Sequence, residues 1–164
     1  MSTRAVFIAI FAAGVASPVR IAAQAQAQPT VVIAGPTLDE ARKALAAAVA
    51  AASKAGVAVS CAVVDSRGDL VALQRMDKAR FITPDIARGK ALAAAIFGQP
   101  SASLEKIGNS PWFQNLNATA QGRLYPVQGA LPIMRNNETL GAIGCSGASG
   151  QQDEDSARAG VSTF

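Results

Sequence analysis

The stretch "VAVSCAVVDSRGDLVALQRMD", residues 57–77, decides the fold because it contains two strands and the turn between them. Residues 57–65 are apolar almost throughout, a pattern typical of a strand buried on both faces. The turn "DSRGD" follows, and its Gly68 is free to take a positive φ. Residues 70–76 form the return strand. A hairpin of this kind predicts antiparallel pairing in the sheet.

Helical patterns flank this hairpin on both sides. Thr37 and Glu40 fit a capping box at the start of a first helix, and Gly56 fits the residue that ends it. Thr83 and Pro84 fit the N-cap and first position of a second helix. The chain therefore enters and leaves the hairpin through helices.

Beyond the second helix, residues 100–107 predict a short third helix, and residues 108–122 predict a long irregular loop. Long loops in compact domains are often functional. The segments "ALPIMR" and "TLGAIGC" predict two more strands with a turn at Asn136 and Asn137. A final helix is predicted to start near Gln152. The order of elements, with hairpins in place of crossovers, predicts an α+β fold.

The first 27 residues are typical of a secretory signal peptide. Arg4 precedes an apolar run, residues 5–16, which is shorter than the roughly 20 residues that span a bilayer. Cleavage can follow Ala25 or Ala27, and we favour Ala27; a retained N-terminal anchor is the alternative. The predicted organisation is a signal peptide at 1–27, an exposed lead-in at 28–36 and a single domain at 37–164. The predicted location is periplasmic or secreted.

Composition excludes several classes of function. The chain has 15 Lys and Arg against 11 Asp and Glu; Arg4 and Arg20 belong to the leader, which leaves 13 against 11. No basic stripe with interleaved aromatics is present, so we expect no nucleic-acid partner. We also expect no membrane association after signal cleavage. The chain has no histidine, which excludes a histidine-based triad and the commonest ligand of transition metals.

Two motifs together carry a family resemblance. The segments "VSCAVVDSRGDLVALQRMD" and "LGAIGCSGASGQQDEDSARAG" resemble the GlcG/HbpS-like haem-binding family, also called haem-degrading, over residues 37–161. The resemblance implies a profilin-like fold, with a five-stranded antiparallel sheet and helices on both faces. It also implies haem as the cofactor and assembly into a homo-oligomer. This sequence departs from the family at Lys78, where the family commonly has glycine, and in "QGALPI", where Gly129 stands alone in place of the family's common Gly-Gly.

The resemblance makes an exported small-molecule-binding protein, with haem or a related tetrapyrrole as its ligand, the leading hypothesis. One alternative is an enzyme that degrades haem or acts on another small metabolite. The sequence supplies no clear general base, nucleophile or metal site, so catalytic residues stay unassigned. Another alternative is an oligomeric accessory or sensor protein.

The two cysteines, Cys61 and Cys145, lie on the first and last predicted strands. The implied sheet makes these strands antiparallel neighbours, so a disulfide is one possibility in an exported protein. Two buried thiols are a second, and a thiolate ligand or redox site is a third. Neither the number nor the spacing of the cysteines fits a zinc site.

Candidate ligand contacts are drawn from both motifs, the second helix and the predicted loop. They are Arg75, Met76, Asp77, Lys90, Trp112, Tyr125, Gly144, Ser146 and Gly147. Arg75 suits a ligand carboxylate, although it also suits an ion pair with Asp65 or Asp77. Lys90 suits a haem propionate, although a lysine that keeps its amine in water is the commoner case.

Aromatic residues in or beside the predicted loop offer walls for a flat ligand. These are Trp112, Phe113 and Tyr125, and anchoring of the loop is the alternative interpretation. Without histidine, an iron ligand would come from Tyr125, Met76, Met134, a cysteine thiolate or a hydroxyl.

Gly144, Gly147 and Gly150 lie where a predicted strand ends and a predicted helix follows, as the glycines of a phosphate-binding loop do. Their spacing matches neither a dinucleotide-binding loop nor a P-loop, and no lysine follows them. Acidic residues 153–155 lie at the start of the next helix and would repel a phosphate. We therefore interpret these glycines as corner residues.

Overall fold

The computed structural model describes residues 35–164. In chain order the elements are α1 (Leu38–Lys54), β1 (Ser60–Asp65), β2 (Leu70–Arg75), α2 (Thr83–Phe97), a 3₁₀ turn η1 (Ser101–Leu104), α3 (Glu105–Gly108), α4 (Pro111–Thr119), β3 (Ala130–Arg135), β4 (Glu138–Ser146) and α5 (Gly150–Val161). The predicted signal peptide lies outside these residues. Of the predicted lead-in only Gly35 and Pro36 are described, and Pro36 is buried.

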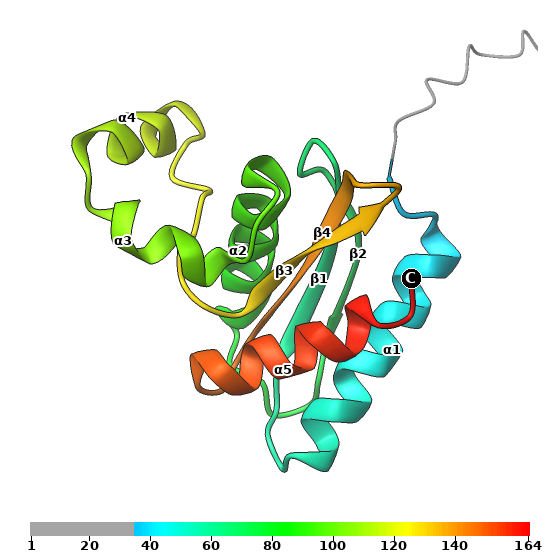
Figure 1. The fold of residues 1–164 in the computed structure, drawn as a ribbon. Helices are drawn as coiled ribbons and strands as arrows, with labels where there is room; N and C mark the ends of the chain where they lie inside the picture. The colour runs from blue at the N-terminus through cyan, green and yellow to red at the C-terminus, as the bar shows by residue number, and fades with distance from the viewer. Residues whose placement is uncertain (1–34) are drawn as a thin grey trace, which may run out of the picture. The chain divides into compact units, whose positions relative to one another are not determined.

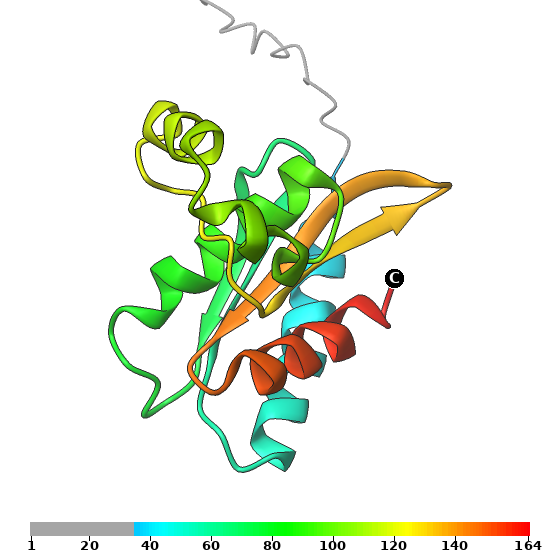
Figure 2. The same ribbon diagram turned by 60° about the vertical axis from the view of Figure 1, so that its left-hand side comes forward.

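The four strands form one antiparallel sheet in the order β2-β1-β4-β3. Helices α1 and α5 pack together on one face and α2 covers the other, so the predicted α+β fold with helices on both faces is confirmed (Figure 1). Helices α3 and α4 lie beyond α2, on the side away from α1 and α5 (Figure 2). No helix within residues 35–164 is long and apolar enough to cross a membrane.

The predicted fifth strand is absent from residues 35–164, so the five-stranded sheet is wrong in its strand count. The chain before β3 instead satisfies its backbone groups against helices. The Tyr125 amide donates to the Gly89 carbonyl (3.2 Å), and the Ser101 hydroxyl donates to the Val127 carbonyl (2.7 Å). The Gln128 amide donates to the Glu105 carboxylate (2.8 Å). These bonds hold the segment against α2, η1 and α3.

Four helical predictions need correction. Thr83, predicted as an N-cap, is the first residue of α2: the N-cap is Ile82, and the Thr83 hydroxyl donates to the Arg80 carbonyl (2.7 Å). The predicted irregular loop at 108–122 contains α4, which begins at an N-cap formed by Ser110 with Pro111 next to it. These two residues carry a helix-start signal that the many polar residues obscured. The predicted short helix at 100–107 is the 3₁₀ turn η1 followed directly by α3. Helix α5 begins at Gly150, two residues before the predicted start, because Ser149 forms a capping box with Gln152.

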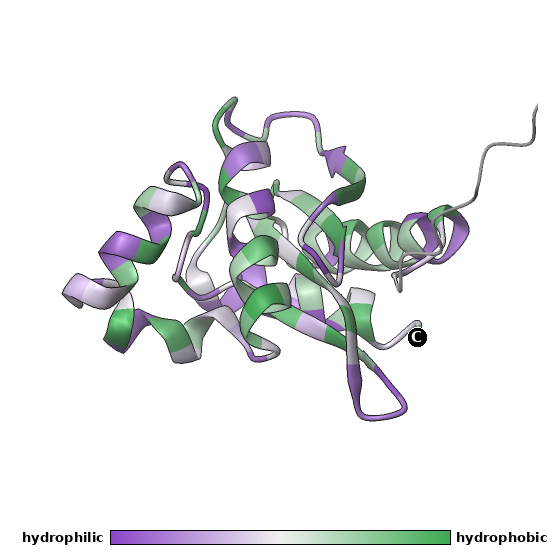
Figure 3. Ribbon diagram, turned by 90° about the horizontal axis from the view of Figure 1, so that it is seen from above, coloured by the Kyte–Doolittle hydropathy of each residue, from purple (hydrophilic) through white to green (hydrophobic). Residues whose placement is uncertain are grey.

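The core has three parts, all made of buried apolar side chains. The largest lies between the sheet and the α1–α5 pair, and contains Leu45, Ile133 and Ile143. The second lies under α2 and is mostly alanine. The third joins α2 to the α3–α4 region through Leu92, Leu104, Phe113 and Leu124. In Figure 3 green segments lie among the strands and on parts of the helices, whereas the exposed β3–β4 turn is purple.

Cys61 on β1 and Cys145 on β4 are directly opposite each other and form a disulfide, with an S–S distance of 2.00 Å. Both are fully buried in the core between the sheet and the α1–α5 pair. The two cysteines lie 84 positions apart in the chain, and the bond joins the first strand of the sheet to the last.

Reduction of this disulfide should lower the free energy of unfolding by about 2–4 kcal/mol, because a long loop is then released in the unfolded chain. The measurement is urea unfolding with and without reductant. Cys61→Ser is the matched control: the chain has no third cysteine, so reductant should not change its stability. Equal stability of the oxidised and fully reduced wild type would contradict the expectation.

Candidate functional site

An open groove of about 430 Å³ runs between α2 and the segment at residues 122–125. Its walls come from a stripe of α2 at spacings of three and four, together with that segment. The lining residues are Ile82, Asp85, Ile86, Arg88, Gly89, Leu92, Gly122, Arg123 and Tyr125. The groove therefore combines aliphatic side chains, one aromatic ring and three charged groups.

Gly89 allows the two walls to meet. A Cβ atom at this position would lie 2.9 Å from the Arg123 carbonyl oxygen and 3.0 Å from the Tyr125 Cβ. The Tyr125 amide also donates to the Gly89 carbonyl (3.2 Å). The missing side chain thus lets the segment bond directly to the backbone of α2, and this contact places Tyr125 at the groove.

The segment is also held from the other side, by the end of α4. The Asn117 side-chain carbonyl accepts from the Leu124 amide (2.9 Å), and the Asn117 backbone carbonyl accepts from the Gly122 amide (2.7 Å). The Arg123 Nε donates to the Ala120 carbonyl (3.0 Å). Arg123 is therefore tethered near its guanidinium group while it lines the groove.

The charges of the groove favour an anion. Arg88 and Arg123 come from different elements, and only Asp85 opposes them among the lining residues. Within residues 35–164, neither Arg88 nor Asp85 takes part in an ion pair. Arginine binds carboxylates through two parallel hydrogen bonds. The groove can therefore accept carboxylate groups at the edge of an apolar ligand.

A second hollow, of about 530 Å³, lies on the other side of the same segment. It shares Gly122 and Tyr125 with the groove. Its other walls come from α3, α4 and the chain leading to β3: Glu105, Gly108, Asn109, Phe113, Gln114, Asn117, Leu124, Pro126 and Val127. Tyr125 thus borders both spaces, and it is the sequence-predicted contact that the geometry places at a cavity.

Comparison with known proteins assigns the family. The family model described as "Haem degrading protein HbpS-like" matches residues 37–162. The chain belongs to this family. It is 32% identical over 133 residues to an uncharacterised 15.0 kDa protein of Citrobacter freundii, a match that covers 80% of this chain and 94% of that one.

Two solved structures share the fold. The Klebsiella pneumoniae protein ORFY is 30% identical with a TM-score of 0.74, over 84% of this chain and 95% of that one. A double mutant of Streptomyces reticuli HbpS is 32% identical with a TM-score of 0.71. This match covers 92% of this chain and 99% of that one. All residues of the groove lie within the part of the chain that matches the HbpS-like model.

The predicted contacts on the hairpin lie away from the groove of this HbpS-like chain. Met76 packs against the core, and its sulfur accepts from the Val59 amide (3.4 Å). The predicted pairing of Arg75 with Asp65 is wrong. Arg75 lies opposite Ser60, at the other end of the hairpin from the turn where Asp65 accepts from the Asp69 amide. Within residues 35–164 no ion pair joins Arg75 to Asp77 either.

Trp112 and Phe113 lie on α4 and pack against Phe97 at the end of α2. The ring centroids of Phe97 and Trp112 are 6.2 Å apart, and those of Phe97 and Phe113 are 6.1 Å apart. Phe113 is fully buried and anchors α4, whereas the Trp112 side chain stays exposed. Trp112 borders neither of the two hollows described above.

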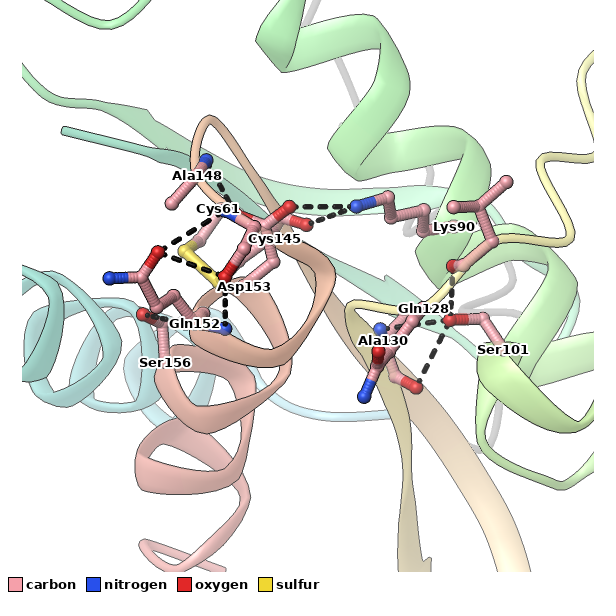
Figure 4. Close-up of polar contacts among 12 residues, drawn as sticks. Cys61, Lys90, Ser101, Gln128, Ala130, Cys145, Ala148, Gln152, Asp153 and Ser156 are labelled. Carbon is pink, nitrogen blue, oxygen red and sulfur yellow. Dashed lines mark hydrogen bonds and ion pairs between the residues drawn. A yellow bond between two sulfur atoms is a disulfide. The ribbon is translucent and has the colours of Figure 1, made fainter. Parts of the chain in front are cut away.

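Lys90 is buried, so the interpretation that its amine stays in water is wrong. Its Nζ lies 2.9 Å from the Asp153 carboxylate on α5 and donates to the Cys145 carbonyl at 3.2 Å (Figure 4). Burial raises the pKa of Asp153, and the hydrogen bond from Lys90 opposes that rise. Gly129 leaves room for the pair, because a Cβ there would lie 2.7 Å from the Lys90 Nζ.

The glycine-rich turn packs against backbone. A Cβ at Gly144 would lie 2.5 Å from the Ala87 carbonyl oxygen of α2, and one at Gly147 would clash with the Ala58 carbonyl. Ser146 between them is buried. The Ala148 amide, which faces the start of α5, donates to the Asp153 carboxylate (3.0 Å). These close contacts therefore serve the fold, and a phosphate would have to displace Asp153.

Of the iron ligands considered from sequence, Tyr125 is the one whose side chain borders the groove. Both cysteines are in the disulfide. The Met76 sulfur accepts from the Val59 amide, and the Met134 sulfur accepts from the Thr139 hydroxyl (3.6 Å) on the β3–β4 hairpin.

Most of the groove, including Arg88 and Arg123, was not predicted from the sequence. A signal was present in the second helix: Ile82, Asp85 and Ile86 form a stripe with Gly89. This stripe includes charged residues, as an exposed helix face does. The stripe becomes one wall of a groove only because residues 122–125, which are distant in the sequence, lie against it.

Replacement of Lys90 by Met should lower the free energy of unfolding by about 3–5 kcal/mol, because Asp153 is left charged, buried and unpaired. The double variant Lys90→Met, Asp153→Leu should recover most of this loss. Urea unfolding measures both. Lys106→Met, at an exposed lysine, is the matched control. A double variant no more stable than the single one would contradict the pairing.

Proposed function

We propose that this protein binds haem or a closely related tetrapyrrole in the groove between α2 and residues 122–125. The observation that carries the proposal is a groove with apolar walls and two arginines, in a chain that belongs to the HbpS-like family. Neither arginine is in an ion pair within residues 35–164. Haem has two matching parts: a flat apolar ring and two propionate carboxylates.

The groove residues fit such a ligand. Ile82, Ile86 and Leu92 supply aliphatic surface for the ring, and their α2 neighbour Arg88 supplies one cation. Arg123 supplies the other from the facing wall. The volume of about 430 Å³ lies within the range of roughly 300–1,000 Å³ that is usual for small-molecule sites.

Tyr125 is the groove residue that could hold iron, since tyrosine is a known axial ligand of haem. Bound haem would supply redox chemistry at its iron. The part of this chain would be to bind the ring, orient the propionates and shield one face from water.

Turnover of haem is a second candidate function, favoured by the description of the family as haem degrading. Its test is product analysis after incubation of the protein with haem and a reductant or peroxide. Recovery of unchanged haem would count against degradation and leave the binding function standing.

We also propose that the protein is exported and forms a homo-oligomer. The buried disulfide supports export, because such bonds persist in oxidising compartments. Exposed Leu70 and Leu73 on the edge strand β2 support assembly. Light scattering of the purified protein tests the oligomer, and a monomer would count against it.

The protein should shift the Soret band of haemin at micromolar concentration. Arg88→Gln and Arg123→Gln should each weaken binding about tenfold, because each removes a charged hydrogen bond to a carboxylate. Arg42→Gln, on the exposed face of α1, is the matched control and should bind as the wild type does. No Soret shift with the wild type would overturn the proposed function.

Protein recovered from the periplasm or medium should begin at Gln28, which intact-mass measurement detects. The physical reason is the A-x-A pattern that precedes this residue. Recovery of the full-length chain only from the cell interior would contradict export.

A further inference from the structure

We infer that the groove recognises the carboxylates and the apolar ring of a tetrapyrrole, and not its metal. Metal-free porphyrin with free propionates should therefore bind as tightly as haem. This inference rests on the proposed function and narrows it to a ligand class: dicarboxylate tetrapyrroles, with or without iron.

Few side chains that line the groove can bind a metal. The chain has no histidine, and its two thiols are joined in a disulfide. In the described part of the chain, both methionine sulfurs already accept hydrogen bonds away from the groove. The donors that line the groove are Asp85 and the Tyr125 phenol.

Ligation of the iron by Tyr125 would contribute little to the affinity for haem. Tyrosine binds ferric iron as a phenolate, so a bond to the metal costs the loss of the phenol proton. The residue is 42% exposed, and water competes with it for the metal. Ligation therefore adds little to the binding that the rest of the groove provides.

The two arginines of the groove are available to bind carboxylates. Arg123 is tethered through its Nε to the Ala120 carbonyl (3.0 Å), so its position costs little entropy on binding. Arg88 forms no ion pair within residues 35–164, and Asp85 does not neutralise it. Both guanidinium groups are therefore available for hydrogen bonds to carboxylates.

The apolar wall of the groove binds the ring of a ligand and not its metal. Ile82, Ile86 and Leu92 contact a ligand through dispersion and burial of apolar surface, which depend on the ring and not on the metal at its centre. Removal of the iron leaves these contacts and both propionates in place.

The test compares three probes on the oxidised full-length protein: haemin, metal-free protoporphyrin IX, and protoporphyrin IX dimethyl ester. Quenching of Trp112, the only tryptophan, reports all three without relying on the iron. We expect haemin and protoporphyrin IX to bind within about threefold of each other. The dimethyl ester should bind at least about tenfold more weakly.

Variants separate the contributions. The double variant Arg88→Gln, Arg123→Gln should bind haemin and protoporphyrin IX much more weakly and should no longer prefer them over the dimethyl ester. Arg42→Gln should keep that preference. Tyr125→Phe should change the affinities for haemin and protoporphyrin IX by the same factor. A larger loss for haemin than for protoporphyrin IX would show ligation by Tyr125 and contradict the inference.

The remaining outcomes are distinguishable. Binding of haemin with no binding of protoporphyrin IX overturns the inference and leaves the proposed function standing. Equal binding of the acid and its ester overturns recognition of the carboxylates. Failure of every probe to bind overturns the proposed function together with the inference.

Discussion

The close approach of α2 to its neighbours on two sides is the contact on which the rest of the structure depends. On the sheet side, Gly144 brings the β4 backbone against the Ala87 carbonyl. On the outer side, Gly89 lets residues 122–125 bond to the helix backbone. One helix therefore belongs to both the core and the groove. A side chain at either glycine would displace α2 from one of its partners, since packed interiors have little free space.

Two further bonds hold this arrangement at one end of the sheet. The disulfide joins β1 to β4, and the ion pair of Lys90 with Asp153 joins α2 to α5 across the Cys145 carbonyl. Lys90 follows Gly89 directly, so the residue next to the groove is tied to the core. A buried ion pair of this kind contributes little net stability, but it strongly disfavours structures in which either charge is unpaired.

Much of the fold could be predicted from local patterns. Thr37 with Glu40 forms the expected capping box, and the hairpin forms where "DSRGD" places the turn. Helix α4 was missed because many polar residues obscured the start signal of Ser110 and Pro111, and because its anchor, Phe113, is buried against other elements. The fifth strand was implied by the family resemblance, whereas the sheet has four strands and the segment before β3 bonds to helices. Arg88 and Arg123 were missed for the same reason, since a charged residue on an exposed helix face has no local signature of a site.

The sequence by itself determined the capping box of α1, the hairpin turn and the family, because these depend on residues close together or on whole motifs. It also determined the absence of histidine, which limits the chemistry of any site. Only the tertiary structure decided that Lys90 is buried with Asp153, and that α2 and residues 122–125 enclose a groove. The physical reason is that burial and pairing are properties of residues distant in the chain, and no local pattern records which of them come into contact.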